Sequence, residues 1–531
     1  MLIITELMKK IAAEFQEAVT RYFAGEATLD DVHTAGKKTG VYPERNKAGE
    51  SYTIRVRIPS GVISYAQLQK ITEIAKLYTE NRAHITTRQN IQLTGVKLKD
   101  AAVILNELME VGISTLGTTG PGPRNITAPP MSGYEIGETF DIVPYALSAI
   151  NYLLKSEENL SLAAKYQIGF SNSDKDYGKA RISDLGFIAD IRDGVKGFRV
   201  FGGGGMGGIA RSGILLNEFI RDDEIYLYID AMKRVLNEQA GIETVGMKVR
   251  TRHLLNKIGD DEFLKVFNQA LLVDKLNLGS LKENSTYVEE KKYEIEIENS
   301  ELIEECSDSS PDIENWVIKT KINGKYVIEY KPQSGNIDSE KINLLTDLIS
   351  KLDYKTVIRV GMEQNILIIG VKIEDISKFK AILGEELYTN SVPRVVSCTG
   401  NRICRIGITD SRKLSEEIYK NISEISNLPD INISGCPSSC GKHHAAEIGF
   451  YGRKRREESG VIDVYRVFLG GNVHESEIEM AKEYGEITEY NVVPFLKELS
   501  DSFKESGKEK FKIFVKENRE KIEEIVKRYY R

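Results

Sequence analysis

The chain has little of several residue types, and each shortage excludes a class of protein. Its 531 residues include 5 cysteines, 13 prolines, 6 histidines and one tryptophan. A secreted protein held by disulfides needs far more cysteine, so the few present are expected to be thiols or metal ligands in a reducing compartment. No apolar run reaches the roughly 18 residues of a membrane span. The N-terminus lacks the basic-then-apolar order of a secretory signal, so we expect a cytoplasmic protein.

Net positive charge is also lacking. The formal net charge is −7, with 28% charged and 41% hydrophobic residues. A nucleic-acid-binding protein usually carries a basic footprint, so we expect neither nucleic acid nor a membrane as a partner. The composition is that of a globular chain with a real core, and the length suits roughly three or four domains of about 150 residues each.

Two parts of the chain resemble each other. The segment Gln89-Asn-Ile-Gln-Leu-Thr-Gly-Val-Lys97 returns 275 residues later as Gln364-Asn-Ile-Leu-Ile-Ile-Gly-Val-Lys372. Three further pairs of segments match in the same order, one of them upstream and two downstream. Around the first copy the pattern predicts strand, helix, strand, strand, helix. Ordered repetition implies a duplicated chain of two similar halves.

Four of the five cysteines fall within 43 positions, in the pattern Cys398-x5-Cys404, 31 intervening residues, and Cys436-x3-Cys440. Four thiolates suit either zinc or an iron–sulfur cluster. Structural zinc sites usually use C-x2-4-C pairs, whereas a cube of iron and sulfide is larger than one ion and tolerates wider spacing. Flanking glycines free the backbone to wrap a bulky group, which favours the cluster. Four buried structural cysteines are the alternative without a metal.

These motifs resemble those of the nitrite and sulfite reductases that contain sirohaem and take electrons from ferredoxin. The resemblance covers about residues 48 to 475. It implies that Cys398, Cys404, Cys436 and Cys440 bind a [4Fe–4S] cluster, and that Cys440 also bridges the cluster to the sirohaem iron. It implies an α+β fold, internally duplicated, with two ferredoxin-like half-domains and two sirohaem-binding α/β domains.

The repeat and the resemblance together predict seven segments. They are a helical segment at 1–47, a half-domain at 48–118, a sirohaem- and anion-binding domain at 119–281, an acidic linker at 282–322, a half-domain at 323–392, a cluster-binding domain at 393–480 and a helical segment at 481–531. We expect the last segment to be a solvated helical end, because Lys and Glu alternate there at helical spacing. Cys306 is expected to be a free thiol in the linker.

Basic and amide residues of the first half match the family's anion-binding motifs. The matching segments are Arg55-Val-Arg57-Ile-Pro-Ser-Gly61, Gly122-Pro-Arg124-Asn125 and Lys165-Tyr-Gln167. By resemblance, the substrate-facing residues are Arg55, Arg124, Lys165 and Gln167. Lys165 suits a proton donor because crowded cations lower the pKa of a lysine, whereas an arginine stays charged.

The cofactor ligands are also implied by resemblance. Thr86-Thr-Arg88-Gln89 resembles a motif whose arginine pairs with sirohaem carboxylates, a pairing that suits the guanidinium fork. The implied set is Arg88, Gln89, Asn125, Gly203, Gly204, Gly205 and Cys440. The run from Gly203 to Gly208 also contains G-x-G-x-x-G after a plausible strand, so a nicotinamide nucleotide loop is a rival interpretation. We favour backbone amides that cradle a sirohaem carboxylate.

The function implied is six-electron reduction of nitrite to ammonia, with sulfite reduction to sulfide as the alternative. Sulfite reductases of the family have Lys-x-Lys and nitrite reductases Lys-x-Asn, whereas this chain has Lys165-Tyr-Gln167. Nitrite is a monoanion and sulfite is substantially a dianion near neutral pH, so the amide favours nitrite. An iron–sulfur sensor without catalysis and a nicotinamide-dependent oxidoreductase are the other classes considered.

The expected electron donor is ferredoxin or a similar small protein. Ferredoxins are acidic, so a local basic patch would have to offset the negative net charge. The run Arg453-Lys-Arg-Arg456, with Lys442 nearby, is either such a docking patch or a solvated hairpin. His443 and His444 are expected at the surface or in supporting positions around Cys440.

Overall fold

The structure is a computed structural model. It describes residues 2–45, 50–160, 162–238, 250–276, 316–458, 460–474 and 478–531. Cys306 and most of the expected acidic linker lie outside the described residues. Within the described ranges, no helix has both the length and the apolarity needed to cross a membrane.

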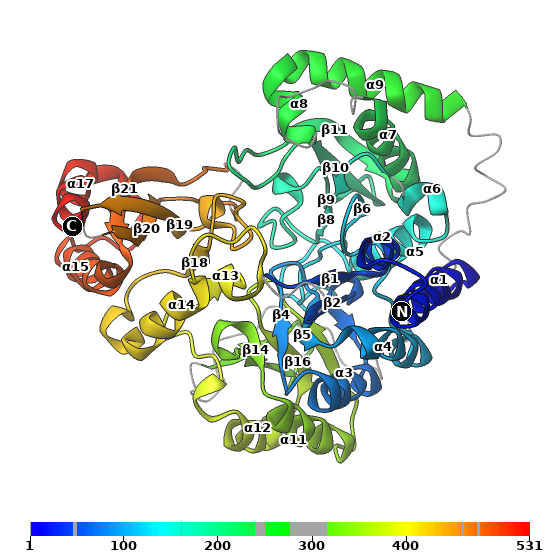
Figure 1. Cartoon of the computed structure of the whole chain (residues 1–531). Coiled ribbons are helices and arrows are strands. Elements are labelled where there is room, and N and C mark those ends of the chain that lie inside the picture. The colour runs from blue at the N-terminus through cyan, green and yellow to red at the C-terminus, as the bar shows by residue number, and fades with distance from the viewer. Residues whose placement is uncertain are drawn as a thin grey trace.

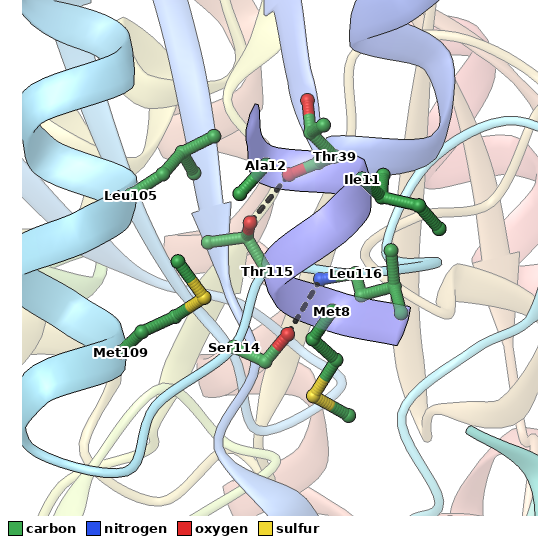
Figure 2. Close-up of a pocket in the computed structure, with 9 residues that line it drawn as sticks. All are labelled: Met8, Ile11, Ala12, Thr39, Leu105, Met109, Ser114, Thr115 and Leu116. Atoms are coloured by element: carbon green, nitrogen blue, oxygen red, sulfur yellow. Dashed lines mark hydrogen bonds between the residues drawn. The ribbon is translucent and has the colours of Figure 1, made fainter. Parts of the chain in front are cut away.

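The chain begins with two capped helices, α1 (Glu6–Phe23) and α2 (Leu29–Thr39). The Thr5 and Thr28 side chains each accept a backbone N–H of the first turn, which replaces a missing helical partner. Figure 2 shows how Met8 and Ile11 of α1 lie over the segment 114–116, around a cavity of only about 10 Å³. Thr115 Oγ1 donates to Thr39 O at the end of α2, so both helices are tied to this segment.

Two similar sheets form the centre of the molecule (Figure 1). The first half contains β1 (Val41–Pro43), β2 (Tyr52–Val56), β3 (Val62–Ile63), α3 (Tyr65–Tyr78), β4 (Ala83–Ile85), β5 (Ile91–Val96) and α4 (Leu98–Glu110). The second contains β12 (Val317–Lys319), β13 (Tyr326–Tyr330), β14 (Asn336–Ile337), α11 (Ser339–Ser350), β15 (Val357–Val360), β16 (Ile366–Val371) and α12 (Ile376–Leu383). The predicted order of strand, helix, strand, strand, helix is confirmed in β2, α3, β4, β5 and α4.

The two halves exchange short strands. The sheet orders are β1-β2-β5-β4-β14 and β12-β13-β16-β15-β3, so each sheet ends on a strand from the other half. Buried residues of both sheets, such as Ile54 and Ile368, belong to one hydrophobic cluster. The halves therefore share a core and stabilise each other.

The repeated glutamines join the halves. Gln89 and Gln364 both have left-handed backbones, with φ of 55° and 60°. Gln89 Nε2 donates to Val360 O at 2.9 Å, and Gln364 Nε2 donates to Ile85 O at 3.0 Å. Each side chain thus reaches a strand of the opposite half, and the sequence repeat is a repeat of this clamp.

A larger domain follows each half-domain. The first contains β6 (Gly122–Pro123), α5 (Val143–Leu153), α6 (Glu157–Leu160), β7 (Lys165–Tyr166), β8 (Ile168–Ser171), β9 (Leu185–Arg192), β10 (Val195–Gly202), β11 (Ile214–Arg221), α7 (Ile225–Glu238), α8 (Thr251–Ile258) and α9 (Asp260–Leu276). The second contains β17 (Val395–Ser397), α13 (Gly400–Ile403), α14 (Ser411–Lys420), β18 (Ile431–Ser434), β19 (Ile448–Glu457), β20 (Gly460–Leu469), β21 (Lys482–Thr488), α15 (Val492–Glu505), α16 (Phe511–Glu517) and α17 (Arg519–Arg528). The predicted duplicated α+β fold is confirmed.

The C-terminal segment differs from the prediction of a solvated helical end. Residues 482–488 form the edge strand β21, and α15 and α17 lie against the same sheet (Figure 1). Ile522, Ile525 and Val526 of α17 are buried in the core of the cluster-bearing domain. These apolar residues form a narrow stripe, and the many charged residues between them lower the mean hydropathy of the segment, so the stripe is easily missed in the sequence.

Candidate functional site

The four clustered cysteines lie at one edge of a sheet. Strands β17 and β18 are parallel neighbours, so their carboxyl ends meet there. Cys398 follows β17, Cys404 follows the short helix α13, and Cys436 and Cys440 follow β18. No group of three or more His, Cys, Asp or Glu in the described part of the chain is arranged to hold a metal ion.

Backbone and hydroxyl groups hold the first thiol. Gly435 N–H donates to Cys398 Sγ at 3.1 Å, and the Ser411 hydroxyl lies 3.3 Å from the same sulfur. Burial raises the pKa of the Cys398 thiol, while these hydrogen bonds oppose the rise. The N–H groups thus point at a sulfur, the arrangement that stabilises a metal-bound thiolate.

Cys440 is the exposed member of the group, whereas Cys436 is buried. Desolvation raises the pKa of Cys440, and the neighbouring thiols Cys398, Cys436 and Cys404 raise it further. The four sulfurs therefore lie close enough to act on one another electrostatically. The Thr87 hydroxyl donates to Cys440 O at 2.7 Å, which ties the cysteine loop to the first half.

Three of the expected substrate-facing residues come together from separate strands. Arg55, on β2, donates from Nη2 to Tyr42 Oη at 3.0 Å and from Nη1 to Thr118 O at 3.2 Å. Arg124 follows β6, where its N–H donates to Tyr166 O at 2.8 Å. Strands β6 and β7 are parallel partners that pair Gly122 with Lys165, two residues before Arg124, and the charge of Arg124 acts on Lys165.

Lys165 lies within electrostatic range of Arg124 and Cys440. The protein around Lys165 desolvates its amine and lowers its pKa, and Arg124 lowers it further, while Cys440 raises it. The Lys165 side chain is nevertheless exposed on its strand. The Lys165 side chain is thus open to solvent while the surrounding protein still desolvates its amine. Burial also lowers the pKa of Arg124, followed by the charge of Arg55.

A cavity of about 180 Å³ opens next to these cations. Its lining includes Tyr42, which holds Arg55, and Gly120, whose carbonyl accepts from Arg124. His33, Lys37 and Arg405 also line it. The residues expected to face the substrate, Arg55, Arg124, Lys165 and Gln167, do not line this cavity, so it is not itself the expected anion pocket.

The expected cofactor ligands differ in how many of their side-chain hydrogen-bonding groups are already paired within the protein. Gln89 Nε2 donates to Ala128 O and its Oε1 accepts from Ala128 N–H, both at 3.0 Å, so its amide is engaged at both ends. Asn125 Nδ2 donates to Ile58 O and Arg88 O, at 2.7 and 3.0 Å. These two amides hold the backbone around Arg88.

The glycine-rich loop does not have the geometry of a nucleotide-binding loop. It connects β10 to β11, which are antiparallel strands, whereas a dinucleotide fingerprint opens a helix. The N–H groups of Gly203 and Gly205 donate to Asp184 O and Arg211 O, at 3.0 Å each. A Cβ on Gly204 would lie 2.5 Å from Arg181 O, so the glycine is required for packing. The nicotinamide interpretation of this loop is therefore wrong, and the Gly203 and Gly205 N–H groups are engaged within the protein, against the prediction that they cradle a sirohaem carboxylate.

The donor set fits a group with many carboxylates. Several buried cationic nitrogens have no hydrogen-bond partner among the described residues, namely Arg55 Nε, Arg57 Nη1, Arg88 Nε, Arg252 Nη1 and Lys442 Nζ. Unpaired buried cations are costly, so a binding partner of opposite charge is expected for them. Sirohaem carries eight carboxylates, and arginine forks suit them.

Sequence reasoning missed two arginines at this site. Arg250 and Arg252 flank the start of α8, and Arg250 lies beside Gln167. Burial lowers the pKa of Arg252 to about 10, and the charge of Arg250 adds to the effect. Both residues lie outside the recognised motifs, and only their basic character was available as a signal.

Three of the four basic residues of the proposed docking patch face carboxylates, whereas Arg456 is exposed. Lys454 pairs with Asp463, Arg455 pairs with Glu457 and Glu486, and Arg453 lies 4.0 Å from Glu486. Lys442 is only 9% exposed, so it belongs to the interior. His443 is also buried, with Nδ1 2.9 Å from Ser434 Oγ, and desolvation lowers its pKa to about 2.

Family comparisons agree with this geometry. The description "Nitrite/Sulfite reductase ferredoxin-like half domain" matches residues 44–111 and 319–386. "Nitrite and sulphite reductase 4Fe-4S domain" matches residues 119–274 and 388–529. The chain belongs to the nitrite and sulfite reductase family. It is accordingly an oxidoreductase of the iron–sulfur type.

Curated relatives and a solved structure extend the comparison. The chloroplastic ferredoxin–nitrite reductase of Betula pendula is 27% identical over 83% of this chain and 75% of the relative. The ferredoxin–nitrite reductase of Synechococcus elongatus is 25% identical over 80% of each. The Mycobacterium tuberculosis NirA protein has the same fold, with a TM-score of 0.78, 19% identity and 97% coverage of both chains.

Proposed function

We propose that this chain reduces nitrite to ammonia with six electrons supplied by ferredoxin, at a sirohaem coupled to a [4Fe–4S] cluster. The observation that carries the proposal is the hydrogen bond from the Thr87 hydroxyl to Cys440 O at 2.7 Å, which brings the cysteine loop against the segment that contains Arg88. A candidate bridging thiolate and a buried cation of the first half therefore lie close together. The names of the relatives, which are ferredoxin–nitrite reductases, support the same reaction.

Residues of this chain would hold both groups. Cys398, Cys404, Cys436 and Cys440 are the proposed cluster ligands, with Cys440 shared with the haem iron. Arg88 and Arg252 are proposed to bind sirohaem carboxylates, since each has a buried nitrogen without a partner. When bound, the coupled pair supplies single electrons and an iron atom for the substrate to bind. Gln89 and Asn125 support this set by holding the backbone around Arg88.

The anion pocket supplies charge and protons. Arg55 and Arg124 are proposed to bind the oxygen atoms of nitrite, because both stay charged at any physiological pH. Lys165 is proposed to donate protons, and its lowered pKa brings it nearer to neutral pH than a free lysine. A sensor without catalysis has no need of such a set of cations around one thiol.

Sulfite reduction is the second candidate. It is favoured by the family itself, whose two matching domains are described for nitrite and sulfite reductases alike. We propose nitrite as the preferred substrate because residue 167 is a neutral amide where a second lysine would suit a dianion.

The test is anaerobic oxidation of a reduced viologen dye by the protein loaded with sirohaem and cluster. Nitrite and sulfite are supplied separately, and kcat/KM is compared. We expect nitrite to be turned over and preferred. A preference for sulfite would refute the substrate assignment, and turnover of neither anion would refute the reductase activity. Bleaching of the chromophores by NAD(P)H alone would refute ferredoxin dependence.

A further inference from the structure

Arg250 forms a three-residue arrangement with Gln167 and Asp184. Its Nη2 donates to Gln167 Oε1 at 3.2 Å and to Asp184 Oδ2 at 2.8 Å, and its Nε lies 3.4 Å from Asp184 Oδ1. The Arg250 side chain is 12% exposed and that of Asp184 is fully buried. An interior ion pair therefore ends on one of the residues expected to face the substrate.

The chemistry of arginine determines which way the Gln167 amide points. A guanidinium has five N–H donors and no acceptor, so only the oxygen of the amide can lie against it. The Nε2 group is then directed away from Arg250. No hydrogen bond joins this Nε2 to any residue in the described part of the chain. Gln167 is thus held with its two N–H donors available.

Hydrogen bonds from two other residues also fix the Asp184 carboxylate. Its Oδ2 accepts from the Gln167 backbone N–H at 2.9 Å, and its Oδ1 accepts from the Thr251 hydroxyl at 2.5 Å. The same carboxylate therefore positions the backbone of Gln167 and the first residue of α8. Arg250, directly before α8, thus contacts Gln167, from which it is separated by 83 positions in the chain.

The arrangement also sets the charge next to the anion pocket. The charge of Arg250 is among those that lower the pKa of Lys165 and of Arg124, so it acts on the pocket. Asp184 lies in contact with Arg250 and offsets much of that charge. Gln167 therefore presents neutral donors beside a compensated cation, where a second lysine would present a full positive charge.

We propose that Arg250 is a positioning residue that turns the Gln167 carboxamide so that its N–H₂ group donates to the bound anion, and that its pairing with Asp184 favours a monoanion over a dianion. The proposal rests on the proposed function, because it assigns Gln167 to the substrate pocket. It adds a specificity determinant that lies outside the recognised motifs.

A double-mutant cycle tests the coupling. Arg250→Met, Gln167→Met and the double variant are compared with the unmodified enzyme. The readouts are the dissociation constant of nitrite, measured from its effect on sirohaem absorption, and the separate kcat and KM for nitrite and sulfite. We expect Arg250→Met to weaken nitrite binding roughly ten-fold, the loss of one hydrogen bond to a charged group. In the Gln167→Met background the same change should have little further effect.

Gln167→Glu provides the matched control. It keeps the size of the side chain and an oxygen for Arg250, but it removes the N–H₂ donors. We expect it to load sirohaem normally and to bind nitrite at least as poorly as Gln167→Met. Arg250→Lys keeps the charge but lacks the fork, so it should restore part of the affinity that Arg250→Met loses.

The outcomes separate this proposal from the proposed function. If the unmodified enzyme neither binds nor reduces nitrite, the function itself is refuted. If it does both, but Arg250→Met weakens binding equally in the two backgrounds, Arg250 does not act through Gln167. Unchanged nitrite affinity in Gln167→Glu refutes the donor role even if Arg250→Met fails to take up sirohaem. An unchanged ratio of sulfite to nitrite turnover in Arg250→Met refutes the effect on specificity.

Discussion

A buried ion pair joins the second half-domain to the cluster-bearing domain. Glu329, on β13, is 2% exposed and meets Arg394, which directly precedes β17. Arg394 Nη2 donates to Glu329 Oε2 at 2.9 Å and its Nε to Oε1 at 3.1 Å. The guanidinium also stacks on the Tyr388 ring, 3.7 Å from its centre. Strand β17 continues into Cys398, so this pair supports the cysteine site.

Arg394→Met should destabilise the protein strongly. It leaves the Glu329 carboxylate in the interior, where Asn365 Nδ2 still donates to it at 2.7 Å. Removal of one partner of a buried ion pair costs about 3–5 kcal/mol. The remaining Asn365 bond and the charge of Lys331, which interacts with Glu329, place the expected loss near the lower limit of that range. A loss of about 3 kcal/mol is a large part of the roughly 5–15 kcal/mol that stabilises a domain.

Urea unfolding of the holoprotein, followed by circular dichroism, measures the loss. The double variant Glu329→Met with Arg394→Met should recover part of it, because the Glu329 carboxylate is no longer left without its guanidinium, while the buried Lys331 loses its interaction with Glu329. Bound iron should fall in Arg394→Met and return in the double variant. A single variant that costs less than about 1 kcal/mol, or a double variant as unstable as the single, would contradict the reasoning.

Three further predictions concern other parts of the chain. Burial lowers the pKa of Lys331 from 10.5 to about 8, so between these pH values the unfolded chain binds more protons and stability should rise with pH. Lys331→Met should remove that rise, and equal slopes for both proteins in urea unfolding would refute the assignment. Serine in place of Cys398, Cys404, Cys436 or Cys440 should abolish iron binding in a colorimetric assay, while Cys306→Ser should retain it; iron retained in any of the four would exclude that ligand. Arg453→Gln with Lys454→Gln should change ferredoxin-driven and dye-driven turnover alike, since both side chains face carboxylates; a selective loss with ferredoxin would restore the docking patch.

Local patterns in the sequence were sufficient to predict the duplicated architecture. The repeated Gln-Asn segments occupy equivalent strands and turns, and Gln89 and Gln364 share the same left-handed backbone. The exchange of β3 and β14 could not be predicted in this way. Each is a two-residue strand whose partner lies in the other half. Hydrophobic periodicity predicts which face of a segment is buried, but it does not predict which segment packs against that face.

The candidate site divides in the same way. Cysteine spacing alone favoured a cluster over a single ion, and the structure adds that the parallel strands β17 and β18 bring the two pairs together. The sequence left the basic run Arg453–Arg456 as either a docking patch or a solvated hairpin, because its carboxylate partners, among them Glu486, come from other strands of the sheet. Gln89 matched a cofactor motif, yet its amide is engaged by backbone groups of both halves.

Residue types and their spacing by themselves predicted the duplication and the thiol set, and the resemblance of the motifs to a family added the cations Arg55, Arg124 and Lys165. Only the tertiary structure decided which charges are compensated and which remain available. Arg250 reaches Gln167 across 83 residues, and Asp184 joins them because β8 and β9 are parallel neighbours that start side by side. The interaction energy of a charge depends on the groups and the effective dielectric around it, and these are set by contacts between segments that are distant in the chain.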